Sequence, residues 1–306
     1  MGEGTVENVV AAWTAVPLHG VADDRPLPFP LFLRTGDDAH VLYRKAGDTV
    51  DAAHVGRLHA EGVDRLFVRA EDLPAYYARI EGSLQDVLLD KAVPIADRAD
   101  VLSGIARQVV DELFSSPIER VGLRRAQRVI MAAGTLLLRD GAAFAAVRAS
   151  LDSKPELAAH GLRTSVLTMG LARAVLGADA ATVGEAGLAG LLHDVGRIGS
   201  DLGDADASHA TRGAAALQKH GLSATVVAAV RDHHERVDGS GKPQGLRGGA
   251  ASELGLLVGL ADVFDDLHTQ RPPGTSLFDV LRVLATTGRG RFDDRHAQAL
   301  VRLFHR

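Results

Sequence analysis

Two adjacent histidines and a glutamate precede a glycine-rich loop in RDHHERVDGSGKPQGLRG, residues 231–248. We expect His233 and His234 to end a helix whose Val227 and Val230 face the core. Imidazole nitrogen is a common metal ligand, so the pair is a candidate for a metal site. A surface turn beside a chance pair of histidines explains the stretch equally well. The choice depends on whether other residues complete a site.

Asp262 raises the same question in LGLLVGLADVF, residues 254–264, where it is the only charged residue. A helix that is apolar on nearly all sides is normally buried, and a buried carboxylate without a partner costs stability. An arginine, a set of hydrogen-bond donors or a metal would compensate it. An aspartate bonded to backbone at a helix edge is the plainer alternative.

Three further places carry residues of the same kinds. Glu156 and His160 are four positions apart, so they share one helix face and could reach one ion or two neighbouring ions, or form a surface contact. His193 and Asp194 follow the apolar run AGLAGLL. Because neighbouring helical residues point about 100° apart, such a pair suits a bridging carboxylate beside a terminal imidazole. His209, in DASHATRGAAAL, would alone be a helix-cap or surface histidine.

All five places lie within residues 151–306, and each ends or interrupts an apolar helix. This coincidence favours a metal centre over scattered structural histidines. The chain has no cysteine, so it forms no disulfide, and such a centre would use nitrogen and oxygen ligands.

The composition sets outer bounds on the class of protein. A chain of 306 residues, 46% apolar and 24% charged, suits a globular protein with two domains. The net charge of −5 argues against a surface that binds a nucleic-acid polymer. The N-terminus lacks the basic start and apolar core of a signal peptide, and no apolar run reaches the roughly 20 residues that span a bilayer. We therefore expect a cytoplasmic protein without membrane contact.

The elements that must position these residues divide the chain into segments. Residues 1–28 are expected to be a loosely structured lead, and residues 29–80 a small α+β module that could receive a signal, dimerise the protein or dock a partner. Within the module, strands are predicted at 31–34, 40–44 and 65–68, with helices from about Asp51 to His59 and in EDLPAYYARI. Residues 81–150 have helical periodicity and form a predicted connector.

The segment 151–306 is predicted to be all-helical, so the fold class is mostly α. Leu162, Val166 and Met169 share one face of its first helix, which we expect to end at Gly177. TVGE, residues 182–185, has capping-box spacing and is predicted to open the helix that leads to GLLHDVGRIG.

The ordered set ELAAH, LLHDVGRIG, SHATRG, HHERVDGSGKPQGL and LADVFDDLHTQRP resembles the HD-GYP family, a branch of the HD superfamily of metal-dependent phosphohydrolases. The resemblance covers about residues 150–306, and the run HHE-x-x-DG-x-G-x-P-x-GL is its most specific part. The upstream segment 30–72 also resembles a small regulatory module that precedes some HD-GYP domains.

The resemblance implies a set of metal ligands and two or three divalent ions. Iron or manganese suits these ligands, and zinc is also compatible. A glutamate at position 156 is typical of the three-metal members, and Asp194 would be the bridging ligand. The implied ligands are Glu156, His160, His193, Asp194, His209, His233, His234 and Asp262.

Members of the family hydrolyse cyclic di-GMP to the linear dinucleotide pGpG, and three-metal members continue to GMP. The resemblance places Asp194 and Arg197 in catalysis, with Arg197 at the position of a usual lysine. It also implies contacts to cyclic di-GMP, and through the GYP loop to diguanylate cyclases or other signalling proteins. The implied substrate-binding residues are Arg197, Asp238, Gly239, Gly241, Lys242 and Arg271.

Three departures from the family pattern keep other functions open. The GYP motif is Gly241-Lys242-Pro243, Arg197 replaces lysine, and the interval from Asp194 to His209 is only 209 − 194 = 15 positions. A signalling module that binds cyclic di-GMP or a protein without turnover is one alternative. Another HD phosphohydrolase, acting on nucleoside phosphates, is a second. Either class could form oligomers.

Overall fold

The computed structural model describes residues 13–21, 25–36, 39–115, 118–151, 157–177, 179–198 and 208–304. The chain divides into two compact units, Met1–Ile105 and Ala106–Arg306. The predicted boundaries of the lead, module, connector and C-terminal domain stay predictions.

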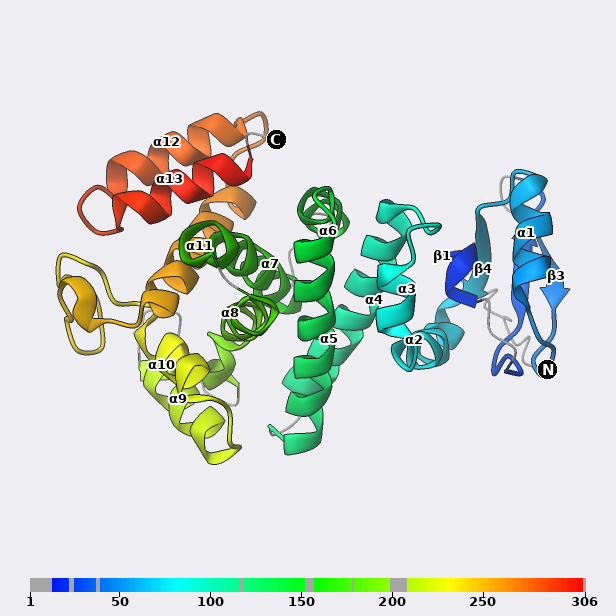
Figure 1. Ribbon diagram of the computed structural model, residues 1–306, viewed down its shortest axis with the longest axis horizontal. Coiled ribbons are helices and arrows are strands. Elements are labelled where there is room, and N and C mark those ends of the chain that lie inside the picture. Colours follow the sequence, from blue (N-terminus) through cyan, green and yellow to red (C-terminus); the bar gives the residue numbers. More distant parts are fainter. Residues whose placement is uncertain are drawn as a thin grey trace, which may run out of the picture. The chain divides into compact units, whose positions relative to one another are not determined.

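The first unit contains an antiparallel sheet with the strand order β1-β4-β2-β3 (Figure 1). Tyr76, Phe29 and Leu66 are among its buried core residues. The elements of this unit are β1 (Trp13–Pro17), η1 (Leu18–Val21), β2 (Leu31–Arg34), β3 (His40–Arg44), α1 (Ala52–Ala60), β4 (Arg65–Arg69), η2 (Ala70–Asp72), α2 (Leu73–Glu81), α3 (Leu84–Leu89) and the start of α4 (Ile95–Phe114).

The expectation of a loose lead over residues 1–28 is wrong for residues 13–21. Trp13–Pro17 forms β1, which pairs antiparallel with β4 from Trp13↔Arg69 to Pro17↔Arg65. The Trp13 ring also packs edge-on against Phe32, with ring centroids 4.7 Å apart. Long-range pairing with a strand 50 residues later therefore orders a segment whose local sequence gave no strand signal. Residues 1–12 lie outside the described residues.

The regular elements in the described residues of the second unit are all helices, which confirms the mostly α fold class. Its helices gather around α7 and α8, which pack against each other (Figure 1). After the end of α4, its elements are α5 (Arg120–Arg139), α6 (Ala143–Leu151), α7 (Leu157–Leu176), α8 (Ala180–Leu192), η3 (Val195–Arg197), α9 (Ser208–Lys219), α10 (Ala224–Asp232), η4 (Gly248–Ala250), α11 (Glu253–Thr269), α12 (Leu277–Thr287) and α13 (Asp294–Leu303).

Small residues on α8 allow its close packing against α7. A Cβ added at Gly190 would lie 2.9 Å from the Cα of Ser165 and 2.9 Å from the carbonyl oxygen of Thr164. The Ser165 hydroxyl in turn donates to the carbonyl of Gly187, at 2.7 Å. These contacts hold the last turns of α8, which lead to His193, against α7.

Several helix details differ from the sequence expectation. The N-cap of α8 is Asp179, whose side chain accepts from the Thr182 amide, so the predicted capping box at 182–185 is wrong. In α10 the core residues include Val226 and Val230, whereas Val227 is only partly buried. The end of α7 is as predicted: Gly177 follows its last residue, with φ of 59°.

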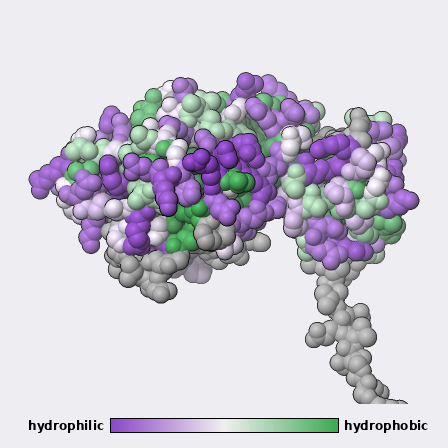
Figure 2. Space-filling view, turned by 90° about the horizontal axis from the view of Figure 1, so that it is seen from below, coloured by the Kyte–Doolittle hydropathy of each residue, from purple (hydrophilic) through white to green (hydrophobic). Residues whose placement is uncertain are grey.

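The visible face in Figure 2 is mostly hydrophilic, with scattered apolar areas, as expected around an apolar core. Within the described residues, no helix combines the length and apolar character that crossing a bilayer requires.

Candidate metal centre

One cluster of possible metal ligands joins three helices of the second unit. His160 comes from α7, His193 is the C-cap residue of α8, and Asp262 lies on α11. One ligand atom from each lies within 4.8 Å of the others. The Nε2 atoms of His160 and His193 are 3.3 Å apart, and they lie 3.2 and 3.6 Å from Oδ1 of Asp262. The structure thus brings together residues up to 102 positions apart (262 − 160 = 102).

A second cluster joins α9 to the end of α10. It consists of His209, His233 and His234, whose ligand nitrogens also lie within 4.8 Å of one another. Nε2 of His209 is 3.3 Å from Nε2 of His233 and 3.1 Å from Nε2 of His234. His209 and His233 are buried, which excludes the surface role that His209 would have if considered alone.

Asp194 lies between the two clusters. Its Oδ1 is 3.0 Å from Nε2 of His209, and its Oδ2 is 3.6 Å from Nε2 of His193. One carboxylate oxygen therefore faces each cluster, as a bridging ligand requires. Nε of Arg197 forms an ion pair with Oδ1, at 2.9 Å.

Contacts on the far side of three imidazoles fix their orientation. Nδ1 of His193 donates to the carbonyl of Gly190, at 2.8 Å, and Nδ1 of His233 donates to the carbonyl of Val230, at 2.6 Å. Nδ1 of His160 donates to Oδ2 of Asp265, at 2.8 Å. With the proton on Nδ1, the Nε2 lone pair of a neutral ring points into the cluster, where a metal would use it.

The electrostatics differ between the clusters. Burial opposes protonation of His160, but hydrogen bonds to Asp262 and Asp265 outweigh it and raise the pKa of His160 to about 10. Burial, aided by neighbouring histidines, holds the pKa of His233 well below its usual value and lowers the pKa of His234 to about 4. His233 and His234 are therefore neutral and ready to bind a cation, whereas a cation at His160 must displace a proton.

The carboxylates of Asp194 and Asp262 are held ionised. Burial would raise the pKa of Asp194, but the His193 charge and the contact with His209 more than offset it and lower that pKa. Burial is likewise outweighed at Asp262, where hydrogen bonds from His160 and His193 lower the pKa.

One observation tests whether these residues fit metal ions. Oδ1 of Asp194 is buried and has no hydrogen-bond partner of acceptable geometry, despite its close neighbours. Arg197 and His209 lie close to this oxygen but do not satisfy it with a well-formed hydrogen bond, so a buried ionised acceptor stays incompletely satisfied, which costs stability. A cation beside it would remove this cost, and the surrounding imidazole and carboxylate ligands suit iron, manganese or zinc. The residues present therefore fit divalent metals.

The loop after His234 is held by a buried glutamate. Glu235 is fully buried and accepts from the amides of Gln244 and Leu246, at 2.7 and 2.9 Å. A Cβ at Gly241 would lie 2.4 Å from the Cα of Glu235 and from the amide nitrogen of Arg236, so only glycine fits there. The loop is thereby kept close to the second cluster.

The predicted substrate-binding residues lie in different surroundings. Arg197 contacts Asp194 beside the clusters. Asp238 accepts from the Ser240 amide, and Gly239 has φ of 77°. Lys242 is exposed, and its amide donates to the carbonyl of His234, at 3.1 Å.

Arg271 follows α11, where its guanidinium donates to the carbonyl of His268. Among the described residues, no interaction joins Arg271 to either cluster. Glu156 and the shortened segment 199–207 lie outside the described residues. The assignment of ligands and substrate contacts stays a prediction.

Sequence reasoning missed Asp265 and Arg163. Both oxygens of the buried Asp265 accept from the buried Arg163 guanidinium, at 2.7 and 2.8 Å, and one also accepts from His160. The available signal was a second acid three positions after Asp262 on an apolar helix, which places both near one face.

Replacing Glu235 with Gln should loosen the loop. The glutamine side chain has an NH₂ group where one carboxylate oxygen now accepts a hydrogen bond, so one of the two backbone amides would lose its acceptor. We therefore expect the free energy of unfolding to fall by about 1–3 kcal/mol. Hydrogen exchange at Gln244 and Leu246 should accelerate. The exposed Glu61→Gln is the matched control. Unchanged exchange at both amides would contradict this role for Glu235.

Comparison with known proteins finds a family match within the helical unit. Residues 157–268 match the HD domain family. The match is to this segment of the chain, and its resemblance to the HD-GYP type is confirmed by the following similarities.

Two curated relatives are similar over about half of the chain. The cyclic di-GMP phosphodiesterase PA4108 of Pseudomonas aeruginosa is 33% identical over 159 residues, covering 47% of this chain and 38% of that protein. The 3'3'-cGAMP-specific phosphodiesterase 3 of Vibrio cholerae is 31% identical over 188 residues, covering 54% and 41%. The matches thus span only about two fifths of these relatives.

A solved structure supports the fold. Bd1817, an HDG"Y"P protein from Bdellovibrio bacteriovorus, matches 96% of this chain and 100% of its own, with a TM-score of 0.68 and 22% identity.

Proposed function

We propose that this chain is a metal-dependent phosphodiesterase that hydrolyses cyclic di-GMP to pGpG and onward to GMP. The observation that carries this function is the Asp194 carboxylate, with one oxygen facing each histidine cluster. The similarity to named cyclic di-GMP and 3'3'-cGAMP phosphodiesterases supports a cyclic dinucleotide as substrate. Because substrates differ among these relatives, both dinucleotides belong in the test.

The metal centre assigns a role to each group of residues. His160, His193 and Asp262 would hold one cation, and His209, His233 and His234 another, with Asp194 shared. Glu156 is the proposed additional ligand for a third. When bound, such cations neutralise phosphate charge and lower the pKa of water.

The chain's own residues orient the substrate and stabilise charge. Arg197, which forms an ion pair with Asp194 through Nε, would donate hydrogen bonds from its guanidinium group to the substrate phosphate. In the hydrolysis, water oxygen bonds to phosphorus, one ring P–O bond breaks, and the leaving 3′-oxygen takes a proton. The loop with Asp238, Gly239 and Gly241 would shape the substrate side of the centre.

Lys242 distinguishes substrate binding from metal binding. Its side chain is exposed on the loop beside the second cluster. Lys242→Tyr should leave metal content unchanged and raise KM for cyclic di-GMP about two- to fivefold, since an exposed charge contributes under about 1 kcal/mol. Steady-state kinetics at two salt concentrations measures this. An unchanged KM would remove Lys242 from substrate binding and leave it as a candidate contact for a diguanylate cyclase.

The direct experiment combines metal content and turnover in one preparation. The full chain is purified anaerobically without chelator, iron, manganese and zinc are quantified, and cyclic di-GMP and 3'3'-cGAMP are followed by chromatography. Two to three metals per chain with formation of pGpG or GMP would support the phosphodiesterase. Metal without turnover of either substrate would favour a signalling module, whose cyclic di-GMP affinity is then measured. Absence of metal even after reconstitution would refute the centre.

The proposed substrate also bears on location. A cytoplasmic chain, as the sequence led us to expect, would meet cyclic dinucleotides as signals within the bacterial cell.

A further inference from the structure

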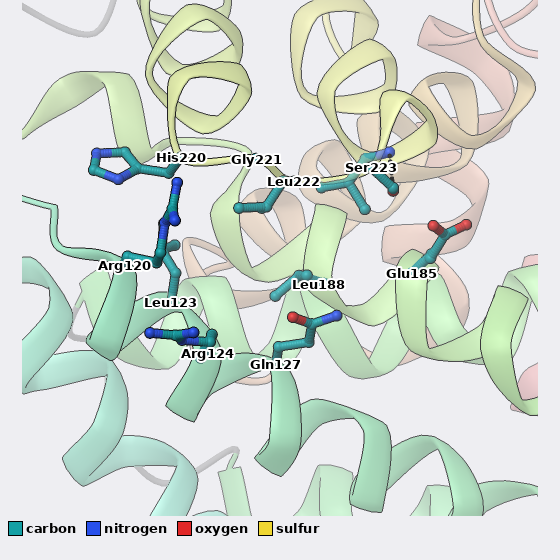
Figure 3. A pocket seen from close by; sticks show the side chains of 11 residues that line it. Arg120, Leu123, Arg124, Gln127, Glu185, Leu188, His220, Gly221, Leu222 and Ser223 are labelled. Carbon is teal, nitrogen blue, oxygen red and sulfur yellow. Dashed lines mark hydrogen bonds between the residues drawn. The ribbon is translucent and has the colours of Figure 1, made fainter.

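A pocket of about 380 Å³ lies between α5, α8 and the turn that joins α9 to α10 (Figure 3). This volume lies within the range of small-molecule sites. Its apolar lining consists of Leu123, Leu188, Leu222 and Val226.

Polar side chains surround this lining and are unevenly arranged. In Figure 3, Arg120, Arg124 and His220 gather on one side of the pocket, Glu185 lies on the other, and Gln127 lies between them. The two guanidinium groups outnumber the single carboxylate, so the side chains around the pocket carry a net positive charge. A ligand with an anionic end and a neutral, donor-bearing end matches this polarity.

None of these five polar side chains is used by the rest of the described protein. Within the described ranges, no hydrogen bond or ion pair joins the side chain of Arg120, Arg124, Gln127, Glu185 or His220 to another residue. Arg120, Arg124 and Gln127 are exposed, and Glu185 and His220 are half-buried, so all five side chains can be reached by a ligand in the pocket. Unpaired groups that converge on a pocket are available to a ligand.

The chemistry of these groups narrows the ligand class. Arginine binds phosphate through paired, charge-assisted hydrogen bonds, and two arginines one turn apart can share one phosphate group. The Glu185 carboxylate accepts hydrogen bonds and repels a second anionic group. The apolar lining suits a sugar or base. These features describe a monophosphate ester that also carries N–H or O–H donors.

The pocket uses helices that also end in the metal centre. Glu185 precedes His193 by eight positions on α8, about 12 Å along the helix, and Val226 precedes His233 by seven positions on α10, about 10 Å. The pocket is therefore separate from the metal clusters, but two of the helices that line it, α8 and α10, also lead to cluster residues.

We propose that this pocket binds a small phosphomonoester as an effector of the metal centre. The effector role, though not the binding, rests on the proposed function. A nucleoside monophosphate and a sugar phosphate share the required chemistry, and direct comparison distinguishes them.

Binding is tested with GMP, ribose 5-phosphate and inorganic phosphate as probes on the metal-loaded full chain. Hydrogen exchange locates each probe, and calorimetry gives its affinity. We expect protection in residues 120–127 and 220–226. Arg120→Gln combined with Arg124→Gln should weaken this binding at least tenfold. The control Arg139→Gln, exposed at the far end of α5, should leave it unchanged.

Several outcomes would overturn the assignment. The probes would bind in the metal centre alone if they protected only peptides around His193, His209 and His233, and if the double variant showed the same protection. No arginine-dependent binding of any probe at millimolar concentration would also refute the pocket. Binding that alters neither metal affinity nor turnover would refute the effector role.

The outcome is separable from that of the proposed function. Arginine-dependent protection in a chain that hydrolyses neither cyclic dinucleotide would support the pocket while refuting the phosphodiesterase. Hydrolysis of a cyclic dinucleotide without arginine-dependent protection would support the phosphodiesterase and refute the pocket.

Discussion

Asp194→Ala is expected to lower bound metal to below one ion per chain and to reduce turnover by more than about a hundredfold. Loss of an outer contact to a metal ligand already costs about 10- to 100-fold, and Asp194 faces both clusters directly. The fold should persist because the Asp194 side chain caps no helix, and its ion-pair partner Arg197 is partly exposed to solvent. Metal analysis, circular dichroism and the hydrolysis assay on one preparation measure these three results.

Asp294→Ala is the matched control for this substitution. Asp294 is exposed in the first turn of α13, in the same unit. It should keep metal and activity. Full activity in Asp194→Ala would show that the centre is wrongly assigned, whereas a collapsed fold would show that Asp194 is structural.

Asp265→Ala should produce the largest loss of stability. It removes two hydrogen-bond acceptors of Arg163, whose exposed fraction is only 4%. Breaking a buried ion pair by removing one partner costs about 3–5 kcal/mol, since the remaining buried charge loses its carboxylate partner. It also frees the His160 ring, so metal affinity should fall about 10- to 100-fold. Denaturant unfolding of the metal-free chain and metal titration measure the two effects.

Two further variants separate stability from metal binding. Asp266→Ala changes the neighbouring, exposed carboxylate and should affect unfolding little. Arg163→Met combined with Asp265→Leu replaces the pair with apolar groups and should recover much of the stability. Its metal affinity should stay low because His160 still lacks its acceptor. Recovery of metal affinity as well would refute the role of Asp265 in orienting His160.

Local sequence patterns predicted most of the helical unit and its chemistry. Asp262 on an otherwise apolar helix indicated that a compensating group must lie nearby, and the structure places His160 and His193 there. His233 and His234 were expected at a helix end, which is where α10 stops. These predictions depended on residues whose burial and local position the sequence itself reveals.

Local sequence patterns did not predict the roles that depend on contacts between residues far apart in the chain. Strand β1 depends on pairing with β4, and Asp265 depends on Arg163, 102 positions earlier. Glu235 appeared to be part of a histidine motif, but its two acceptors bind amides 9 and 11 positions later. In each case the partner, rather than the local sequence, determines the role.

The last turn of α10 has an electrostatic consequence. His233 binds the carbonyl of Val230, so the ligand ring sits at the helix end where the peptide dipoles leave partial negative charge. A cation there gains about 0.3–1 kcal/mol from the helix alone. The opposite end of α10, at Ser223–Val226, carries partial positive charge and borders the arginine-lined pocket. One nine-residue helix thus presents opposite poles to a cation and to an anion.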